Sequence, residues 1–195
     1  MKKLITTAVI TGLLLALGAG FAQPFTPSAA HDVAIQIPNV LFLRITDGTD
    51  NEAVTGAVVN FDFASDAAAI NEYLDFVAAG GGWVGHTDST PAFGDVIVFS
   101  NRDGWRVTVQ ATAFAPAGFS LANVRVTPDG TNETSADMLS EWTLSTTAQD
   151  IAEDGGRTVG WESLGFSAGA YEIDLDGTED PGDYTTTVTY TIAQP

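Results

Sequence analysis

The feature that most constrains the fold is a period-two alternation of apolar and polar residues in short runs. The runs are separated by Gly-, Asp- and Asn-containing turn signals roughly every ten residues from Asp95 onward. The alternation is clearest over residues 184–192, where aromatic and aliphatic side chains alternate with threonines. Because successive side chains of a strand point to opposite faces, this run predicts an apolar inner face and a threonine-rich outer face. The pattern predicts an all-β fold, an antiparallel β-sandwich.

Alternating runs elsewhere predict the remaining strands. The N-terminal run, Asp32–Ile45, predicts a half-buried strand with Pro38 at a bulge or an edge, and Ala57–Phe63 predicts a second strand. The run Trp105–Phe114 places Trp105 on the same face as two valines. Further strands are expected within residues 96–99, 121–126, 138–145, 159–166 and 170–175, and a long loop is expected over residues 83–93.

One segment has the helical period instead. Ser65-Asp66 can cap a helix that runs through Ala79, and three glycines follow it. Four apolar residues fall on one stripe of this helix, at Ile70, Tyr73, Leu74 and Val77. We therefore expect one short surface helix that packs against the sandwich.

The first 22 residues predict an exported protein. Lys2 and Lys3 precede an apolar run that ends in small residues, which is the order of a secretory signal peptide cleaved after Ala22. Residues 23–30 contain two prolines and predict a flexible leader, and residues 31–195 predict a single β-sandwich domain. No later stretch is apolar for long enough to predict a membrane span.

Composition excludes several function classes. Five arginines face 25 acidic residues once the two lysines are removed with the predicted signal peptide, so the formal charge falls from −18 to −20. This charge repels nucleic acids and anionic lipids, and it suits cations, basic surfaces, solubility or a salt-rich habitat. The chain has no cysteine, which excludes disulfides, thiol catalysis and zinc–thiolate sites.

Two segments carry a resemblance to a known family. Residues 101–109 read Asn-Arg-Asp-Gly-Trp-Arg-Val-Thr-Val, and residues 182–192 read Gly-Asp-Tyr-Thr-Thr-Thr-Val-Thr-Tyr-Thr-Ile. Together they resemble the WxL family of secreted bacterial surface proteins, with Trp105-Arg106-Val107 and Tyr190-Thr191-Ile192 in place of the family's W-x-L triplets. An intact triplet occurs at Trp142-Thr143-Leu144. The resemblance implies an antiparallel β-rich domain that associates non-covalently with the cell wall.

Aromatic residues are candidate binding residues. The resemblance implies roles for Trp105 and Tyr190, although their alternation with valines also places them in the core. Trp83 follows a glycine run and Trp161 precedes Glu162, so these two indoles are candidates for exposed platforms on which a sugar could stack. Packing within loops or the core is the alternative for both.

The densest cluster of acidic residues lies just before the last strand. Calcium binds six to eight oxygen ligands from a flexible loop. This segment supplies five carboxylates, from Asp174, Asp176, Glu179, Asp180 and Asp183. The spacing is not that of an EF-hand, and a charged hairpin connection explains the same residues. Calcium is thus the one cofactor that the sequence suggests, and the turn Asp47–Glu52 is a weaker site of the same kind.

Two further motifs predict no catalytic site. Residues 165–169 match the G-x-S-x-G nucleophile elbow, but an alternating strand pattern follows them and both histidines, His31 and His86, precede them. Residues 165–169 therefore predict a turn of small residues. The loop His86-Thr87-Asp88 offers too few donors for a transition-metal site and predicts a solvated loop.

We therefore expect a non-enzymatic, exported cell-surface or envelope protein that binds cell-wall polymer or other surface proteins. Two alternatives remain open. In a surface fibre, Asp32–Ile45 would be the strand donated to a neighbouring subunit. In a carbohydrate-binding module, Trp83 or Trp161 would form the platform for the sugar.

Overall fold

The computed structural model describes residues 34–85 and 89–195. Residues Pro38–Pro195 form one compact unit. The predicted signal peptide (1–22), the predicted leader (23–30) and the loop residues 86–88 lie outside the described residues.

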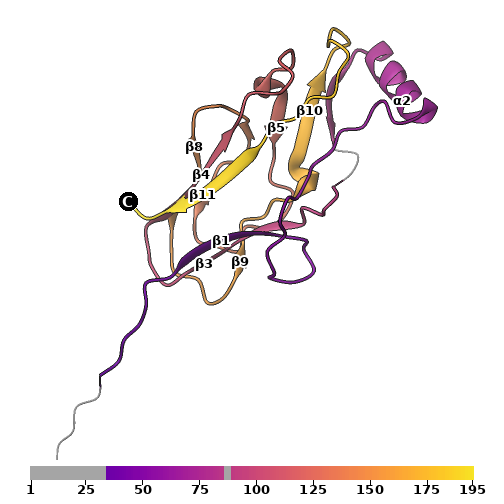
Figure 1. Cartoon of the computed structure of the whole chain (residues 1–195). Coiled ribbons are helices and arrows are strands. Elements are labelled where there is room, and N and C mark those ends of the chain that lie inside the picture. Colours follow the sequence, from indigo (N-terminus) through magenta and orange to yellow (C-terminus); the bar gives the residue numbers. More distant parts are fainter. Residues whose placement is uncertain (1–33, 86–88) are drawn as a thin grey trace, which may run out of the picture. The chain divides into compact units, whose positions relative to one another are not determined.

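The described chain forms three antiparallel sheets and one α-helix, which confirms the prediction of an all-β, sandwich-like fold (Figure 1). The first sheet has the order β1 (Leu41–Thr46), β3 (Asp95–Ser100), β9 (Glu162–Ser163). The second has the order β2 (Gly82–Gly85), β10 (Tyr171–Leu175), β5 (Val124–Val126), β7 (Trp142–Thr143). The third has the order β11 (Val188–Ala193), β4 (Trp105–Ala111), β8 (Gln149–Gly155), β6 (Asp137–Met138).

The core lies where the inner faces of the sheets meet. Along β4 buried residues alternate with more exposed ones, as a strand with one buried face requires. Phe166 is 1% exposed and packs against Trp142 of β7 and Tyr190 of β11, with ring centroids 5.2 and 5.5 Å apart. One phenylalanine thus connects the second sheet to the third.

The two segments that carry the family resemblance are neighbours in the third sheet. Strand β11 pairs antiparallel with β4, and the register places Tyr190 opposite Val109 and Ile192 opposite Val107. Residues 77 to 87 positions apart in the sequence therefore form one ladder. The shared register explains why both segments alternate in the same way.

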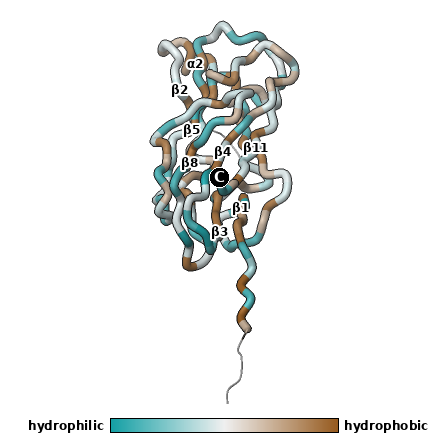
Figure 2. The backbone as a smooth tube through the Cα atoms, turned by 90° about the vertical axis from the view of Figure 1, so that its left-hand side faces the viewer, coloured by the Kyte–Doolittle hydropathy of each residue, from teal (hydrophilic) through white to brown (hydrophobic). Residues whose placement is uncertain are grey.

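The predicted N-terminal strand is shorter than expected. Strand β1 begins at Leu41, and residues 34–40 belong to no sheet although their hydropathy alternates (Figure 2). Proline has no N–H to donate to a ladder. The side chain of Asn101 replaces the ladder here, because it donates to the carbonyl of Pro38 at 2.7 Å and accepts from the N–H of Val40 at 2.9 Å.

The predicted helix is present as α2 (Ala67–Ala78). Asp66 is the N-cap, and its carboxylate accepts hydrogen bonds from the N–H groups of Ala68 and Ala69. After the helix, Gly81 has a φ of 65° and lies so close to β10 that a Cβ would sit 2.2 Å from the carbonyl oxygen of Leu175. The helix contains no buried residue, and its apolar stripe is divided: Tyr73 packs on the core while Leu74 is exposed.

Three further predictions were wrong in detail. Residues 57–63 form no strand, although Val59, Phe61 and Phe63 are half-buried against the core. The predicted loop over residues 83–93 contains β2. The predicted strand over residues 184–192 has only its second half in a strand, β11, and the sequence pattern did not predict β8 at all.

Candidate functional site

A cleft of about 990 Å³ lies between the second and third sheets. One wall comes from β10 and the other from β11, and the irregular segment 56–64 and residues 179–187 close its sides. Ligand sites for small molecules have volumes of about 300–1,000 Å³ and mostly apolar linings. This cleft, which we call the aromatic cleft, meets both criteria.

Aromatic rings from several separate segments line the aromatic cleft. Phe63 packs against Tyr73 of α2 with ring centroids 5.9 Å apart. On another segment, Tyr184 contacts Phe119 at 5.7 Å and Phe114 at 6.4 Å. Segment 57–63 faces its odd-numbered apolar residues inward, so the alternation that failed to make a strand still builds this wall.

Two tyrosines from opposite sheets meet deeper in the cleft. The hydroxyl of Tyr171 on β10 hydrogen-bonds to the hydroxyl of Tyr190 on β11. Burial raises the pKa of Tyr171 to about 12, and burial together with the neighbouring Tyr171 raises the pKa of Tyr190 well above its ordinary value. Both phenols are therefore neutral at physiological pH. Tyr190, which the resemblance implies as a binding residue, is half-buried and lines the cleft.

Three of the five predicted calcium ligands lie at the cleft. Glu179, Asp180 and Asp183 line its rim. The Glu179 carboxylate accepts hydrogen bonds from the N–H groups of Asp176 and Gly177 and from the hydroxyl of Tyr73, at 2.7, 2.9 and 3.0 Å. Burial first, then the contact with Glu179, raises the pKa of the Tyr73 phenol. This tether fixes α2 to the turn after β10.

Two of the five predicted ligands, Asp174 and Asp176, serve as strand and turn residues of the fold. Asp176 accepts from the N–H and the hydroxyl of Thr178, which lowers the pKa of its carboxyl. Asp174 lies on β10 opposite Trp83 of β2. Within residues 34–85 and 89–195, no three His, Cys, Asp or Glu side chains converge as a metal ion requires. The second acidic turn is similar, since Asp47 accepts from the N–H and hydroxyl of Thr49.

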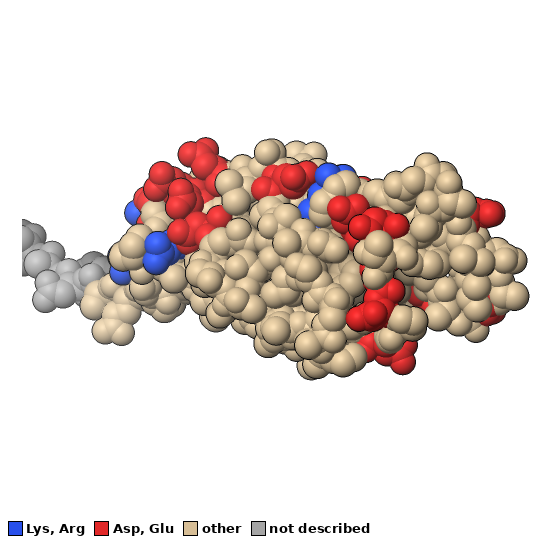
Figure 3. Space-filling model, turned by 90° about the horizontal axis from the view of Figure 1, so that it is seen from above, with Lys and Arg blue, Asp and Glu red and all other residues tan. Residues whose placement is uncertain are grey.

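Acidic side chains also dominate the surface. Figure 3 shows one face, on which acidic groups outnumber basic ones and the basic groups lie beside acidic ones. Arg125 illustrates this pairing, because its guanidinium lies 2.6 Å from the carboxylate of Glu172 and 3.5 Å from that of Glu141. None of the five arginines, all of them in the described part of the chain, lines the aromatic cleft.

The two tryptophans predicted as sugar platforms lie outside the cleft and are half-buried. The guanidinium of Arg125 stacks on the ring of Trp83, 4.3 Å from its centroid, and that of Arg44 stacks on Trp161 at 4.2 Å. Trp161 also contacts Phe99, with ring centroids 5.7 Å apart. A cation thus already occupies a ring face of each indole.

Trp105 is a core residue. Its side chain is 0% exposed, and the indole N–H donates to the carbonyl of Gly156 at 2.6 Å. Its neighbour on the same face, Val107, is equally buried. These residues position β4 and make no contact with solvent.

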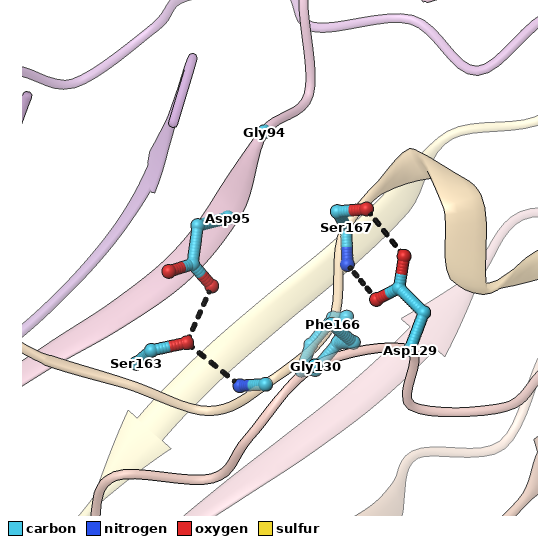
Figure 4. A pocket seen from close by; sticks show the side chains of 8 residues that line it. Gly94, Asp95, Asp129, Gly130, Ser163, Phe166 and Ser167 are labelled. Carbon is cyan, nitrogen blue, oxygen red and sulfur yellow. Dashed lines mark hydrogen bonds between the residues drawn. The ribbon is translucent and has the colours of Figure 1, made fainter. Parts of the chain in front are cut away.

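A second, smaller pocket contains the G-x-S-x-G segment (Figure 4). Its volume is about 220 Å³. The Ser167 hydroxyl donates to Asp129 at 2.7 Å, the Ser167 N–H donates to the same carboxylate at 3.0 Å, and the hydroxyl accepts from the N–H of Gly169. Ser167 caps a one-turn 3-10 helix (Ala168–Ala170) that leads into β10. The serine caps this short helical turn ahead of an antiparallel strand, which agrees with the prediction of a turn.

One carboxyl in this pocket has a perturbed pKa. Desolvation is the largest cause that raises the pKa of Asp95, and the negative charges of Glu133 and Asp129 raise it further. The hydroxyl of Ser163 opposes this by donating to Asp95 at 2.8 Å. The loop His86-Thr87-Asp88, which the sequence predicts to be solvated, lies outside the described residues.

No family model, curated protein or solved structure matches this chain. No helix within residues 34–85 or 89–195 is long and apolar enough to cross a membrane. The fold and the aromatic cleft therefore carry the functional argument.

Proposed function

We propose that this chain is a non-enzymatic protein of the cell surface or envelope that binds cell-wall polymer through the aromatic cleft. One observation carries the proposal: a cleft of about 990 Å³ opens between two sheets and is lined mostly by apolar and aromatic residues. Its size exceeds what packing leaves between sheets, since voids larger than one water are few in a domain.

The lining suits a polymer that carries both apolar and hydroxyl-bearing groups. Aromatic faces such as those of Tyr184 and Phe63 give stacking surfaces, and the rim carboxylates of Asp180 and Asp183 accept hydrogen bonds. The resemblance of strands β4 and β11 to WxL surface proteins supports a wall polymer as the ligand. The signal-like first 22 residues support export.

Co-sedimentation with isolated cell-wall sacculi tests the proposal. The exported chain, which the sequence predicts to begin at Gln23, is expected to pellet with sacculi at both low and high salt. The variant Ala57→Trp adds an indole to the cleft wall and is expected to abolish pelleting. Its control, Ala148→Trp, adds the same group at an exposed position outside the cleft.

Two results would refute the proposal. One is wild-type protein that stays in the supernatant at both salt concentrations. The other is Ala57→Trp pelleting like wild type while both variants keep the wild-type circular dichroism spectrum. Retention that disappears only in high salt would indicate non-specific electrostatic adsorption and would also count against it.

A surface-fibre subunit is the second candidate function, and the segment before β1 favours it. Ile35 and Ile37 are 79% and 78% exposed and alternate along an extended stretch. Strand β1 itself pairs with β3 from Leu41 to Thr46. Only the residues before Leu41 therefore remain as the strand that could be donated to a neighbouring subunit. Concentration-dependent polymers that vanish on Ile35→Asp/Ile37→Asp would support this function, and a monomer at all concentrations would refute it.

A further inference from the structure

Two carboxylates at the rim of the aromatic cleft are not used by the fold. The other two acidic residues of the lining are committed, because Glu179 holds Tyr73 and its own turn and Asp62 accepts from two backbone N–H groups. Within residues 34–85 and 89–195, the side chains of Asp180 and Asp183 have no hydrogen-bond or ion-pair partner. Both lie on the same segment, which leads into β11.

An aromatic trio adjoins these carboxylates. Tyr184 directly follows Asp183, its hydroxyl donates to the carbonyl of Asp180 at 2.8 Å, and its ring packs on Phe114 and Phe119. The rings of Phe114 and Phe119 meet edge to face with centroids 5.3 Å apart. Aromatic faces attract cations, and the attraction grows when the cation is partly desolvated.

The charged side chains that line the cleft are all acidic. Four carboxylates and no arginine contribute to the lining. At the sites of Trp83 and Trp161, by contrast, an arginine of the chain itself stacks on the ring. The end of the cleft at Tyr184 thus presents the same partners, aromatic rings and carboxylates, without the chain's own cation.

We propose that the aromatic cleft binds a ligand with an apolar body and an ammonium group, and that the ammonium lies between Asp180, Asp183 and the ring of Tyr184. The apolar body extends toward the Tyr171–Tyr190 pair, where the lining is most buried. This inference rests on the proposed binding function of the cleft and specifies the chemistry of the group that it recognises. A wall polymer that bears amino groups would supply the ammonium part of this chemistry.

Three probes with the same apolar body test the inference on the wild-type exported chain. They are 3-phenylpropylammonium, 3-phenylpropan-1-ol and 4-phenylbutanoate, titrated into ¹⁵N-labelled protein and followed by amide chemical shifts. We expect the ammonium probe to bind on the order of tenfold more tightly than the alcohol, and the carboxylate to bind most weakly. The shifted amides should lie in residues 114–119 and 180–187.

Two double variants, each of which removes two negative charges, test whether the preference for ammonium arises at the cleft. Asp180→Asn/Asp183→Asn should remove the preference for ammonium over alcohol. Glu153→Gln/Asp154→Asn removes the same charge from exposed positions on β8, outside the cleft, and should retain the preference. Equal loss in both variants would show that only the net charge of the protein matters and would overturn the inference.

The outcomes separate this inference from the proposed function. Equal affinity for ammonium and alcohol, or shifts outside the cleft, overturns the inference, and sacculus binding can persist in that case. Conversely, ammonium preference at the cleft in a protein that fails to pellet with sacculi confirms the ligand chemistry and overturns wall binding.

Discussion

At the scale of single residues, the hydroxyl pair Tyr171–Tyr190 gives the clearest prediction. Burial raises both pKa values, that of Tyr171 to about 12. A group whose folded pKa is raised contributes stability that is complete below its unfolded pKa and is lost as pH rises through its folded pKa. In an alkaline titration followed by tyrosinate absorbance, we expect Tyr171 to ionise only near pH 12 and Tyr190 to ionise well above the pH at which an exposed tyrosine does, unless the protein unfolds first.

The native protein should therefore lose stability above about pH 10, where unfolded tyrosines ionise. Circular dichroism recorded alongside absorbance checks the coupling. Ionisation of all four tyrosines near pH 10 with an unchanged circular dichroism spectrum would contradict the buried pair.

Asp95 gives a prediction of the same sign at lower pH. Desolvation raises the pKa of its carboxyl in the folded protein. Its contribution to the stability of the fold is therefore complete below the unfolded pKa and is lost as pH rises through the folded pKa. Asp95→Asn keeps an oxygen that accepts from Ser163 and removes the charge. We expect thermal melts to show the variant gaining stability relative to wild type between about pH 4 and pH 7. If the wild type instead became more stable relative to the variant over this range, the result would contradict desolvation of the Asp95 carboxyl.

Sequence reasoning found part of the cleft at this scale. It singled out Tyr190 through the resemblance of its strand to the WxL family and three rim carboxylates for their density, because both signals are local. It did not find Phe61, Phe114 or Phe119, since these residues join Tyr184 in one lining only when segments distant in sequence come together. It also could not show that arginines cover Trp83 and Trp161, because those contacts cross between strands.

At the scale of elements, helix α2 is held by its cap and its tether more than by burial. None of its residues is buried, and Tyr73 reaches Glu179 across the turn after β10. Removing the cap with Asp66→Ala should cost about 1 kcal/mol, because two backbone N–H groups lose their acceptor. Hydrogen exchange should accelerate in α2 while the core strands change little.

Glu72→Ala is the matched control, because it removes an exposed carboxylate from the middle of the same helix. Equal acceleration in both variants would show that the cap does not hold the helix. Acceleration throughout β4 and β10 would show that α2 is not a separate unit of stability.

The helix and the strands could be predicted from the sequence where a single local rule determined them. The cap at Asp66 and the glycines after Ala79 determine α2, and the alternation of β4 determines a half-buried strand. Residues 34–40 alternate equally well and form no strand, because Pro38 and the side chain of Asn101 interrupt the ladder. Strand β8 has two adjacent buried residues, Ile151 and Ala152, where its pairing with β4 shifts register, and this irregularity hides its period.

At the scale of the whole molecule, Phe166 is the central packing residue. It contacts Trp142, Tyr190 and Phe93, and so connects β7, β11 and the segment before β3. Phe166→Ala should cost about 3–5 kcal/mol, because it leaves a cavity between the sheets. Urea denaturation should show a lower midpoint with an unchanged slope.

Phe42→Ala is the control at an aromatic residue that is 56% exposed and also contacts Trp161. A loss in Phe166→Ala no larger than that in Phe42→Ala would contradict the central position of Phe166. The fold class was predictable from the alternation, whereas the cleft depends on how far the sheets stand apart, which no local pattern encodes.

Hydrogen exchange of the exported chain, with and without solubilised wall polymer, tests directly whether the polymer binds in the aromatic cleft. Binding in the aromatic cleft predicts added protection in residues 56–64 and 179–187, which close its sides. Protection confined to the outer sheet faces around Trp83 or Trp161, or no added protection at all, would contradict the cleft as the binding site.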